Sequence, residues 1–320
     1  MKRLSLLILL VCIAPVSQSE APVTLANNSA DMVSRTYQLA QQQNPEAQYQ
    51  LAVRYLHALG ITQNNQQALD WYLRAARNKH IKAMYTTGIR YIAGAGVDRD
   101  YPEGFYWLRK AAQAGHTESQ FKTGYNYLFG RGTNKNVTKA LSWLERAAEN
   151  NHALAQHQLY KVFSKGKDIT RNPSLAYRWL RKAANNDHPE SMFIIAKQYL
   201  FRDKPQQWEL TTAKDWLLKA ARMDHPASQH YLAEMYRNGT GMAVDFTLAA
   251  LWYRKAALNE YSSAQYNLAM MYLKGDGLQT SRESSVFWLK QCLNSSLKLS
   301  NFDQTHAMAK QALLSIHQNR

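Results

Sequence analysis

Five of the ten histidines recur nine residues after a tryptophan, and a row of imidazoles is a pattern that could bind metal. The row comprises His80, His116, His152, His188 and His225. If each ring stands on its own helical unit, successive rings lie about 10 Å apart, the distance between packed helices. A zinc ion needs ligands about 2 Å away. These histidines also follow turn-forming residues such as Gly115, Asn151 and Asp187. We therefore assign them to turns and expect no metal site.

A second chemical pattern is the segment 119–124, SQFKTG, which reads as S-x-x-K overlapping K-T-G. Both strings occur in penicillin-recognising enzymes, where the serine is the nucleophile. In those enzymes they are separate elements, and they are accompanied by an S-D-N that is absent from this chain. Ser119 also falls in a row of small residues with Ala83 and Ala155. We interpret it as a packing residue, predict that the chain is not an enzyme, and keep a hydrolase as the weakest alternative.

Composition restricts the other classes of site. The chain has 320 residues, 46% hydrophobic and 19% charged, which is enough apolar content for a folded core. Of its two cysteines, Cys12 lies in a segment that we expect to be removed, so Cys292 has no partner for an intramolecular disulfide. Cys292 stands where other units have Ala220 and Ala256, which predicts a small buried residue. Neither a phosphate-binding loop nor H-E-x-x-H occurs, and we predict no cofactor.

The first nineteen residues have the three-part plan of a secretory signal peptide. A basic head (MKR) precedes the apolar run 4–16, and Ser17-Gln18-Ser19 offers small residues around a cleavage site. The run is too short for a transmembrane span, and we predict none. We expect export to the periplasm, or alternatively secretion. The formal charge of +16 then favours acidic proteins or anionic envelope polymers, and nucleic acid is not expected as a partner.

One unit is repeated seven times along the chain. Seven of the eight tryptophans are spaced 36, 36, 36, 37, 36 and 36 residues apart, and Trp208 is the exception. Each opens a similar string, such as WYLRAA, WLRKAA or WLERAA. The seven are Trp71, Trp107, Trp143, Trp179, Trp216, Trp252 and Trp288. A period in this range is typical of a solenoid.

Each unit is predicted to begin with a helix A, over residues 45–58 in the first unit. Sixteen residues before each tryptophan, or seventeen in the fifth unit, stands an aromatic that we call the reference ring. The reference rings are Tyr55, Tyr91, Tyr127, Phe163, Tyr199, Tyr236 and Tyr272. A small residue stands eight positions before each of them, and another ring stands six before. Residues eight apart, like residues four apart, fall on the same side of a helix, so this spacing is helical.

A helix B that carries the tryptophan follows a turn, which often contains paired glycines such as Gly94 and Gly96. The fifth unit has RDKP at 202–205 instead, which predicts the most irregular turn of the array. Seven positions before the tryptophan, six units have a residue that can accept the free amides of a helix start. These are Asn64, Asp100, Asn136, Asn172, Asp245 and Ser281. Basic residues gather at the other end of helix B, so part of the charge is structural.

This pattern of helix A, glycine turn, cap residue, tryptophan and K/R-A-A triplet resembles the Sel-one-like repeat (SLR), a branch of the tetratricopeptide-like α/α solenoids. The resemblance implies an all-α superhelical solenoid of seven helix pairs of about 36 residues, with A helices lining the concave side. We divide the chain into a signal peptide at 1–19, an N-terminal tail and capping helix at 20–44, seven repeats at 45–297 and a C-terminal capping helix at 298–320. The capping helices themselves are expected at 31–43 and 301–317.

The candidate binding residues occupy the freest positions of helix A, which are one, two and five before the reference ring. Positions one and five before share a helical stripe, and the resemblance implies that it faces the groove. The predicted partner-binding residues are Gln50, Arg54, Thr86, Arg90, Lys122, Asn126, Tyr231, Met235, Met270 and Met271. The first units are polar and basic, whereas the last carry rings and flexible methionines that suit a peptide or helix. The alternative is that these methionines pack between neighbouring units.

Known members of this family act mostly as adaptors and regulators. The resemblance therefore implies an exported, non-catalytic adaptor or regulator that binds a segment of a partner protein in its groove. The basic charge motivates the alternative, a binder of an anionic cell-wall or envelope polymer. One cysteine-rich branch of the family is linked to β-lactam hydrolysis, but it has a disulfide in each repeat and this chain has none.

Overall fold

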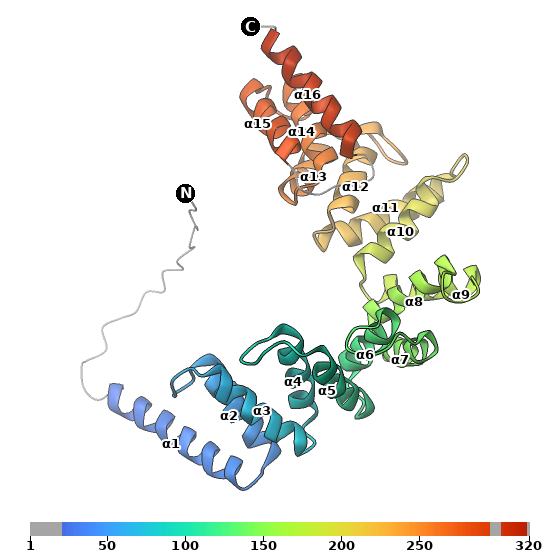
Figure 1. Cartoon of the computed structure of the whole chain (residues 1–320). Helices are drawn as coiled ribbons and strands as arrows, with labels where there is room; N and C mark the ends of the chain where they lie inside the picture. Colours follow the sequence, from blue (N-terminus) through green and yellow to red (C-terminus); the bar gives the residue numbers. More distant parts are fainter. Residues whose placement is uncertain (1–20, 295–301, 319–320) are drawn as a thin grey trace. The chain divides into compact units, whose positions relative to one another are not determined.

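The computed structural model describes residues 21–294 and 302–318, and within them it contains sixteen α-helices and no strand (Figure 1). The A helices are α2 (Pro45–His57), α4 (Ile81–Ala93), α6 (Thr117–Phe129), α8 (Ala153–Lys165), α10 (Pro189–Leu200), α12 (Pro226–Asn238) and α14 (Ser262–Lys274). The B helices are α3 (Asn65–Arg77), α5 (Tyr101–Gln113), α7 (Val137–Glu149), α9 (Pro173–Asn185), α11 (Gln207–Arg222), α13 (Phe246–Leu258) and α15 (Arg282–Asn294). The prediction of an all-α solenoid of seven helix pairs is confirmed.

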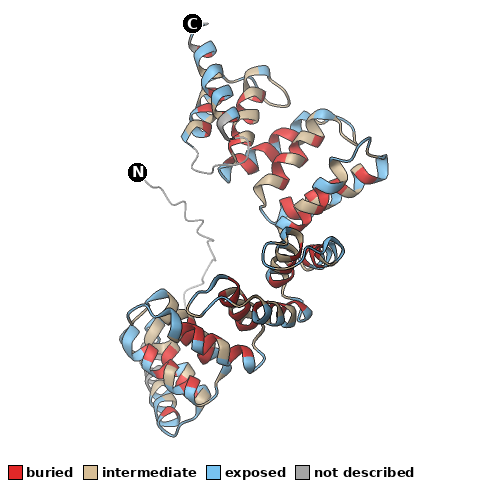
Figure 2. Ribbon diagram, turned by 45° about the vertical axis from the view of Figure 1, so that its right-hand side comes forward, coloured by how far each residue is buried: buried red, intermediate tan, exposed pale blue. Residues whose placement is uncertain are grey.

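The chain forms two compact units, Met1–Ala111 and Ala112–Arg320. In the first, α1 (Ala21–Gln41) packs on α2, α2 on α3, and α3 on α4. In the second, each helix from α6 to α15 packs on the next, and α16 (Phe302–Gln318) packs on both α14 and α15. Buried residues lie where consecutive helices meet, and exposed ones lie on the loops and outer helix faces (Figure 2).

Six of the seven B helices start where the cap-type residues predict, and α11 is the exception. The Asn64 and Asn136 side chains accept hydrogen bonds from the backbone amides of Gln67 and Lys139, both at 2.9 Å. The other four predicted caps make the equivalent bond to the residue three positions later: Asp100, Asn172, Asp245 and Ser281. Such a bond satisfies one of the free amides of a helix start, so one residue per unit sets the helix register.

The turn after helix A needs a left-handed residue, and glycine usually supplies it. Gly94 and Gly130 close α4 and α6 with φ of 71° and 68°. The fifth unit differs, as predicted, because Phe201, the residue after α10, has a φ of −105° and is not left-handed. There α11 begins early, at Gln207, and its added turn carries the out-of-register Trp208, which is 59% exposed.

Small residues let paired helices approach closely. A Cβ atom added at Gly88 of α4 would lie 2.8 Å from Leu108 Cγ and 2.9 Å from the carbonyl oxygen of Gly104, both on α5. In other units the same position holds alanine, such as Ala196 and Ala233, with no exposure. The helix pair therefore closes at a distance that larger side chains would prevent.

The basic residues at the end of helix B cover the repeat tryptophans. In five units a cation three residues after the tryptophan lies 4.5–4.8 Å from the ring centroid. These cations are Arg74, Arg146, Lys182, Lys219 and Lys255. Since a cation over an indole face is stabilising, this part of the positive charge has a structural role beyond the helix dipole.

Helices precede and follow the seven repeats. The first, α1, is longer than the predicted 31–43, and α16 lies within one residue of the predicted 301–317. The predicted signal peptide at 1–19 lies outside the described residues. Within the described part of the chain, no helix is both long enough and apolar enough to cross a membrane.

Candidate functional site

The periodic histidines start the A helices. In α4, α8 and α12 the Nδ1 atom of the preceding histidine accepts a hydrogen bond from the backbone amide three residues later, at 3.0, 3.2 and 3.3 Å. His116 and His188 cap α6 and α10 in the same way. The residue before each cap has a positive φ, and only Gly115 is a glycine there; the others include Lys79, Asn151 and Asp187. The predicted assignment of these histidines to turns is confirmed.

The other imidazole nitrogen bridges neighbouring repeats in alternate units. Because Nδ1 accepts the amide proton, the neutral ring carries its own proton on Nε2. That atom lies 3.0 Å from Glu46 in His80, 2.7 Å from Glu118 in His152 and 3.0 Å from Glu190 in His225. The hydrogen bonds from His152 and Lys122 lower the pKa of Glu118 to about 2. These bridges join residues 34 or 35 positions apart, so they link consecutive A helices.

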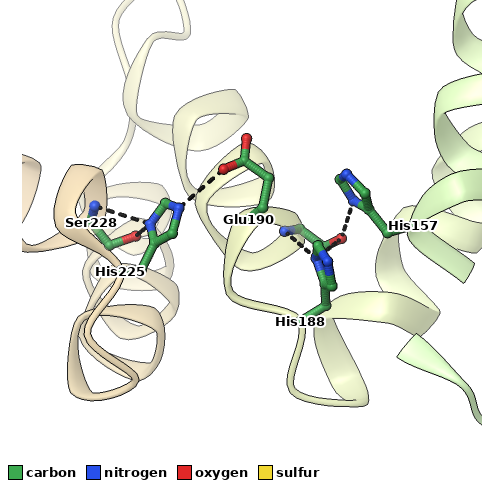
Figure 3. A network of polar contacts seen from close by, with 6 residues as sticks. His157, His188, Glu190, His225 and Ser228 are labelled. Atoms are coloured by element: carbon green, nitrogen blue, oxygen red, sulfur yellow. Dashed lines mark hydrogen bonds and ion pairs between the residues drawn. The ribbon is translucent and has the colours of Figure 1, made fainter. Parts of the chain in front are cut away.

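Two sets of polar contacts, one between α8 and α10 and one between α10 and α12, link three A helices of the second compact unit (Figure 3). Ser191 Oγ lies 2.8 Å from His157 Nδ1 and 3.0 Å from His188 Nδ1. The rings of His157 and His188 stack with their centroids 4.2 Å apart. Burial, together with His188 and Lys161, lowers the pKa of His157 to about 4. The network therefore favours neutral imidazoles between α8 and α10.

A buried amide clamp closes the first, third, fourth and sixth helix pairs, and sequence reasoning missed it. In the first repeat Gln48 Nε2 donates to the carbonyl oxygen of Ala40 at 3.1 Å, and Gln48 Oε1 accepts from Asn78 at 2.9 Å. Gln156 and Asn186 repeat the second contact at 2.9 Å. The sequence pattern that indicates the clamp is a glutamine seven positions before the reference ring, which occurs in five of the seven units. The clamp satisfies buried polar groups, which makes its role structural.

Metal chemistry finds no support in the geometry of the histidine row. Among the described residues, no group of three or more His, Cys, Asp or Glu side chains is arranged to hold a metal ion. The ring nitrogens of His152 and His225 are both engaged, one with a backbone amide and one with a carboxylate. The row acts as a series of helix caps.

The serine and lysine of the SQFKTG segment lie in structural roles. Ser119 is fully buried, and its hydroxyl lies 2.8 Å from His116 Nδ1 at the start of α6. The Lys122 ammonium lies 3.1 Å from Glu118, and Thr123 is buried. A nucleophile must reach its substrate, and this hydroxyl does not reach the surface.

Cys292 is buried and free, as its alanine-like position predicts. Burial raises the pKa of its thiol to about 11. A thiol with a raised pKa is mostly protonated at neutral pH and therefore unreactive. Its role is packing on α15.

The predicted groove residues fall into an accessible set and a buried set. Gln50 is exposed, whereas Arg54, Thr86, Lys122, Tyr231 and Met270 are half-buried. The position five before the reference ring is nowhere buried, from the first unit to the last. Gln50 donates to Glu46 at 2.7 Å, and Arg54 donates to the carbonyl oxygen of Leu59 at 3.1 Å.

The other four predicted groove residues are buried beneath the accessible set. Arg90 is 7% exposed, Asn126 8%, and Met235 and Met271 both 2%. In these four units the position one before the reference ring packs beside a fully buried row three residues earlier, whereas in the first, fourth and fifth units it stays half-buried or exposed. That row comprises Leu51, Thr87, Thr123, Leu159, Ile195, Leu232 and Leu268. Met235 and Met271 belong to the core between the last repeats, in agreement with the alternative that they pack between neighbouring units.

Comparison with known proteins agrees with this architecture. A solved Sel1 repeat protein from Oxalobacter formigenes is 23% identical, covers 91% of this chain and 81% of its own, and superposes with a TM-score of 0.73. The structure of c5321, described as a protective antigen of uropathogenic Escherichia coli with an SLR fold, is 22% identical with a TM-score of 0.52, and covers 89% of this chain and 68% of its own. Among curated protein sequences, none matches this chain significantly.

The family assignment comes from the repeats themselves. The Sel1 repeat matches seven consecutive segments: 45–80, 81–116, 117–152, 153–188, 189–225, 226–261 and 262–291. Each segment from the first to the sixth ends at a cap histidine, or at Tyr261 in the sixth, so the matched unit is the helix pair described above. The chain belongs to the Sel1 repeat family.

Proposed function

We propose that this chain is a non-catalytic protein-interaction adaptor that binds a segment of a partner protein on the face formed by its A helices. Sel1 repeats are typically protein-interaction modules and generally non-catalytic scaffolds. The observation that carries the proposal is the contrast between rows of helix A. One packing row holds only Ala or Ser and another only Leu, Ile or Thr, whereas the accessible rows two and five before the reference ring range from Lys and Glu to Tyr and Met. A surface that varies on a constant scaffold is suited to recognition.

The accessible rows change character along the array. Within the second compact unit, Lys122 brings a positive charge to the third repeat, whereas Tyr231 and Met270 bring a ring and a thioether to the sixth and seventh. A partner segment with carboxylates toward one end and apolar side chains toward the other would match this gradient. The family resemblance implies that the A helices line the concave side, and the predicted signal peptide would deliver the adaptor to the periplasm or outside the cell.

In-cell crosslinking of the tagged chain, followed by mass spectrometry, tests the proposal. The face variant combines Arg54→Ala, Lys122→Ala, Tyr231→Ala and Met270→Ala, and leaves the buried Arg90 untouched. We expect one protein to be captured by the native chain and lost with this variant, at unchanged helicity.

A control variant matches those four changes at exposed positions on α9 and at the end of α11, with Tyr177 38% and Met223 44% exposed. It combines Arg178→Ala, Arg222→Ala, Tyr177→Ala and Met223→Ala. Equal capture by the native chain and the face variant would contradict the assignment of the binding face. Loss with the control variant alone would move the site to the B helices.

Binding of an anionic envelope polymer is the alternative that the +16 charge suggests. Its support is weaker because five cations already lie over tryptophan rings. Sedimentation with purified cell wall at rising salt measures it, since exposed charge contacts are screened by salt. Absence of co-sedimentation at low salt would exclude it. For the hydrolase alternative, a chromogenic β-lactam assay with Ser119→Ala as control is expected to show no turnover.

A further inference from the structure

A cavity of about 340 Å³ opens between α6 and α8, the A helices of the third and fourth repeats, within the second compact unit. It lies on the A-helix face, because Gln158 and Val162 of its wall occupy the positions five and one before the reference ring of the fourth unit. The loops after α6 and α8 close its ends through Lys135, Lys167 and Asp168. None of the predicted groove residues lines it.

The rim of this cavity is rich in lysine. Lys135 pairs with Asp168 at 2.7 Å across the two loops. Lys161, Lys165 and Lys167 are exposed, and no carboxylate of the described residues lies within ion-pair distance of them. We call the cavity with these four lysines the lysine pocket.

Helix dipoles do not explain this charge. The carboxyl-terminal ends of α6 and α8 each carry about half a negative charge, so together they offset about one lysine. Lys135 is already neutralised by Asp168. About two positive charges are therefore left to face solvent across the cavity, and an anionic ligand would relieve their mutual repulsion.

The floor of the pocket is apolar, which limits the kind of anion that fits. Leu128, Phe129 and Val162 line it, and Phe129 is 51% exposed despite its size. Arg131 approaches the Phe129 ring from the loop, 6.0 Å from its centroid. A bare inorganic anion would leave this apolar surface uncovered, whereas a side chain flanked by carboxylates would cover it.

We propose that the lysine pocket binds an acidic segment of a partner protein, with one apolar side chain on Phe129 and Val162 and with flanking carboxylates paired to Lys161, Lys165 and Lys167. The inference rests on the proposed adaptor function and specifies where, and with what chemistry, the partner is recognised. It places acidic recognition in the third and fourth repeats.

Fluorescence anisotropy of the full chain with labelled peptides tests the pocket directly. The probe is GSEEFEEGSG, and its uncharged counterpart is GSQQFQQGSG. We expect only the acidic probe to bind, with affinity falling as salt rises. The variant K161Q/K165Q/K167Q should weaken it about tenfold, because each exposed ion pair contributes modestly. The charge-reversed variant K161E/K165E/K167E should bind GSKKFKKGSG instead.

Controls separate the pocket from net charge. Arg178→Gln, Arg222→Gln and Lys290→Gln together remove the same charge at exposed positions outside the pocket, and they should leave binding unchanged. Phe129→Ala should weaken the acidic probe without changing its salt dependence. Equal loss in the control triple variant, or competition by inorganic phosphate beyond the effect of matched ionic strength, would overturn the proposal.

The capture experiment, repeated with K161Q/K165Q/K167Q, distinguishes failure of the pocket from failure of the adaptor function. If a partner is captured by the native chain and equally by the pocket variant, the pocket inference is wrong and the adaptor function stands. If the acidic probe binds in the pocket but the native chain captures no protein, the pocket stands and the adaptor function fails.

Discussion

Replacing His157 with phenylalanine should remove much of the acid sensitivity of the α8–α10 junction. The ring stacks on His188 and is held by Ser191, and its pKa is lowered from 6.5 to about 4. Phenylalanine is a suitable substitute because Phe121 and Phe193 occupy the same position in neighbouring repeats. The change keeps the packing and removes the titrating group.

The direction of the effect follows from proton linkage. Between pH 6.5 and about 4 the unfolded chain binds a proton at His157 that the folded chain does not, so stability falls as the pH falls through this window. The full difference would correspond to about 3.4 kcal/mol, at about 1.4 kcal/mol per pKa unit. Because the ring keeps partial contact with water, screening reduces the expected effect to about 1–2 kcal/mol.

Hydrogen exchange of α8 and α10 amides measures the local opening free energy, which suits a repeat array better than a single global transition. At about pH 7.5 the variant should lie within about 1 kcal/mol of the native chain, and at about pH 4.5 it should be the more stable at this junction. A residual slope remains from His188 and His230, whose pKa values are also lowered by burial. His57→Gln, at an exposed position, is the control. An unchanged pH dependence in His157→Phe would refute the reasoning.

Three further predictions concern single residues. Gly88→Ala should destabilise the chain by about 1–3 kcal/mol, because the new methyl group would overlap Leu108. Gly115→Asn should cost less, because it meets no atom within 4 Å and its cost is limited to backbone strain at a φ of 92°. Thermal unfolding compares the two variants, and equal effects would contradict the packing argument. Cys292 should resist alkylation in the folded chain and react once denaturant is added. Mass spectrometry detects the label, and fast alkylation of Cys292 in the folded chain would disprove its burial. Glu118→Gln should lower the free energy of unfolding by about 1 kcal/mol near neutral pH. This difference from the native chain should vanish as the pH falls from 4.5 towards 2, because the Glu118 carboxylate of the native chain then becomes protonated. If urea unfolding at low pH shows an undiminished difference, the bridge to His152 is not its cause.

Local signals in the sequence predicted most of the fold. A cap residue, a glycine turn and a tryptophan act within one helix pair, so Asn64, Gly94 and the irregular turn at 202–205 could be read from residue types alone. The burial of Cys292 followed from comparing the seven units. These features depend on neighbours within about a turn or on the repetition of one environment.

Contacts between repeats were harder to foresee. The bridge from Glu46 to His80 joins residues 34 positions apart, and nothing in either residue's surroundings announces the other. The burial of Met235 and Met271 depends on side-chain depth, which a helical wheel gives only when the buried row is included. The lysine pocket depends on two loops meeting, and loop positions are not encoded in the repeat period.

The out-of-register Trp208 gives the chain an optical reporter of its own. At 59% exposure it is open to collisional quenching, whereas Trp71, Trp107, Trp179 and Trp252 are only 7–8% exposed. Red-edge excitation with a neutral quencher should therefore separate emission at the α10–α11 turn from that of these four indoles, and comparison with Trp208→Phe removes the contribution of the half-buried Trp143, Trp216 and Trp288. Events near the most irregular turn of the array can be followed in the unlabelled protein, with Trp208→Phe as the blank.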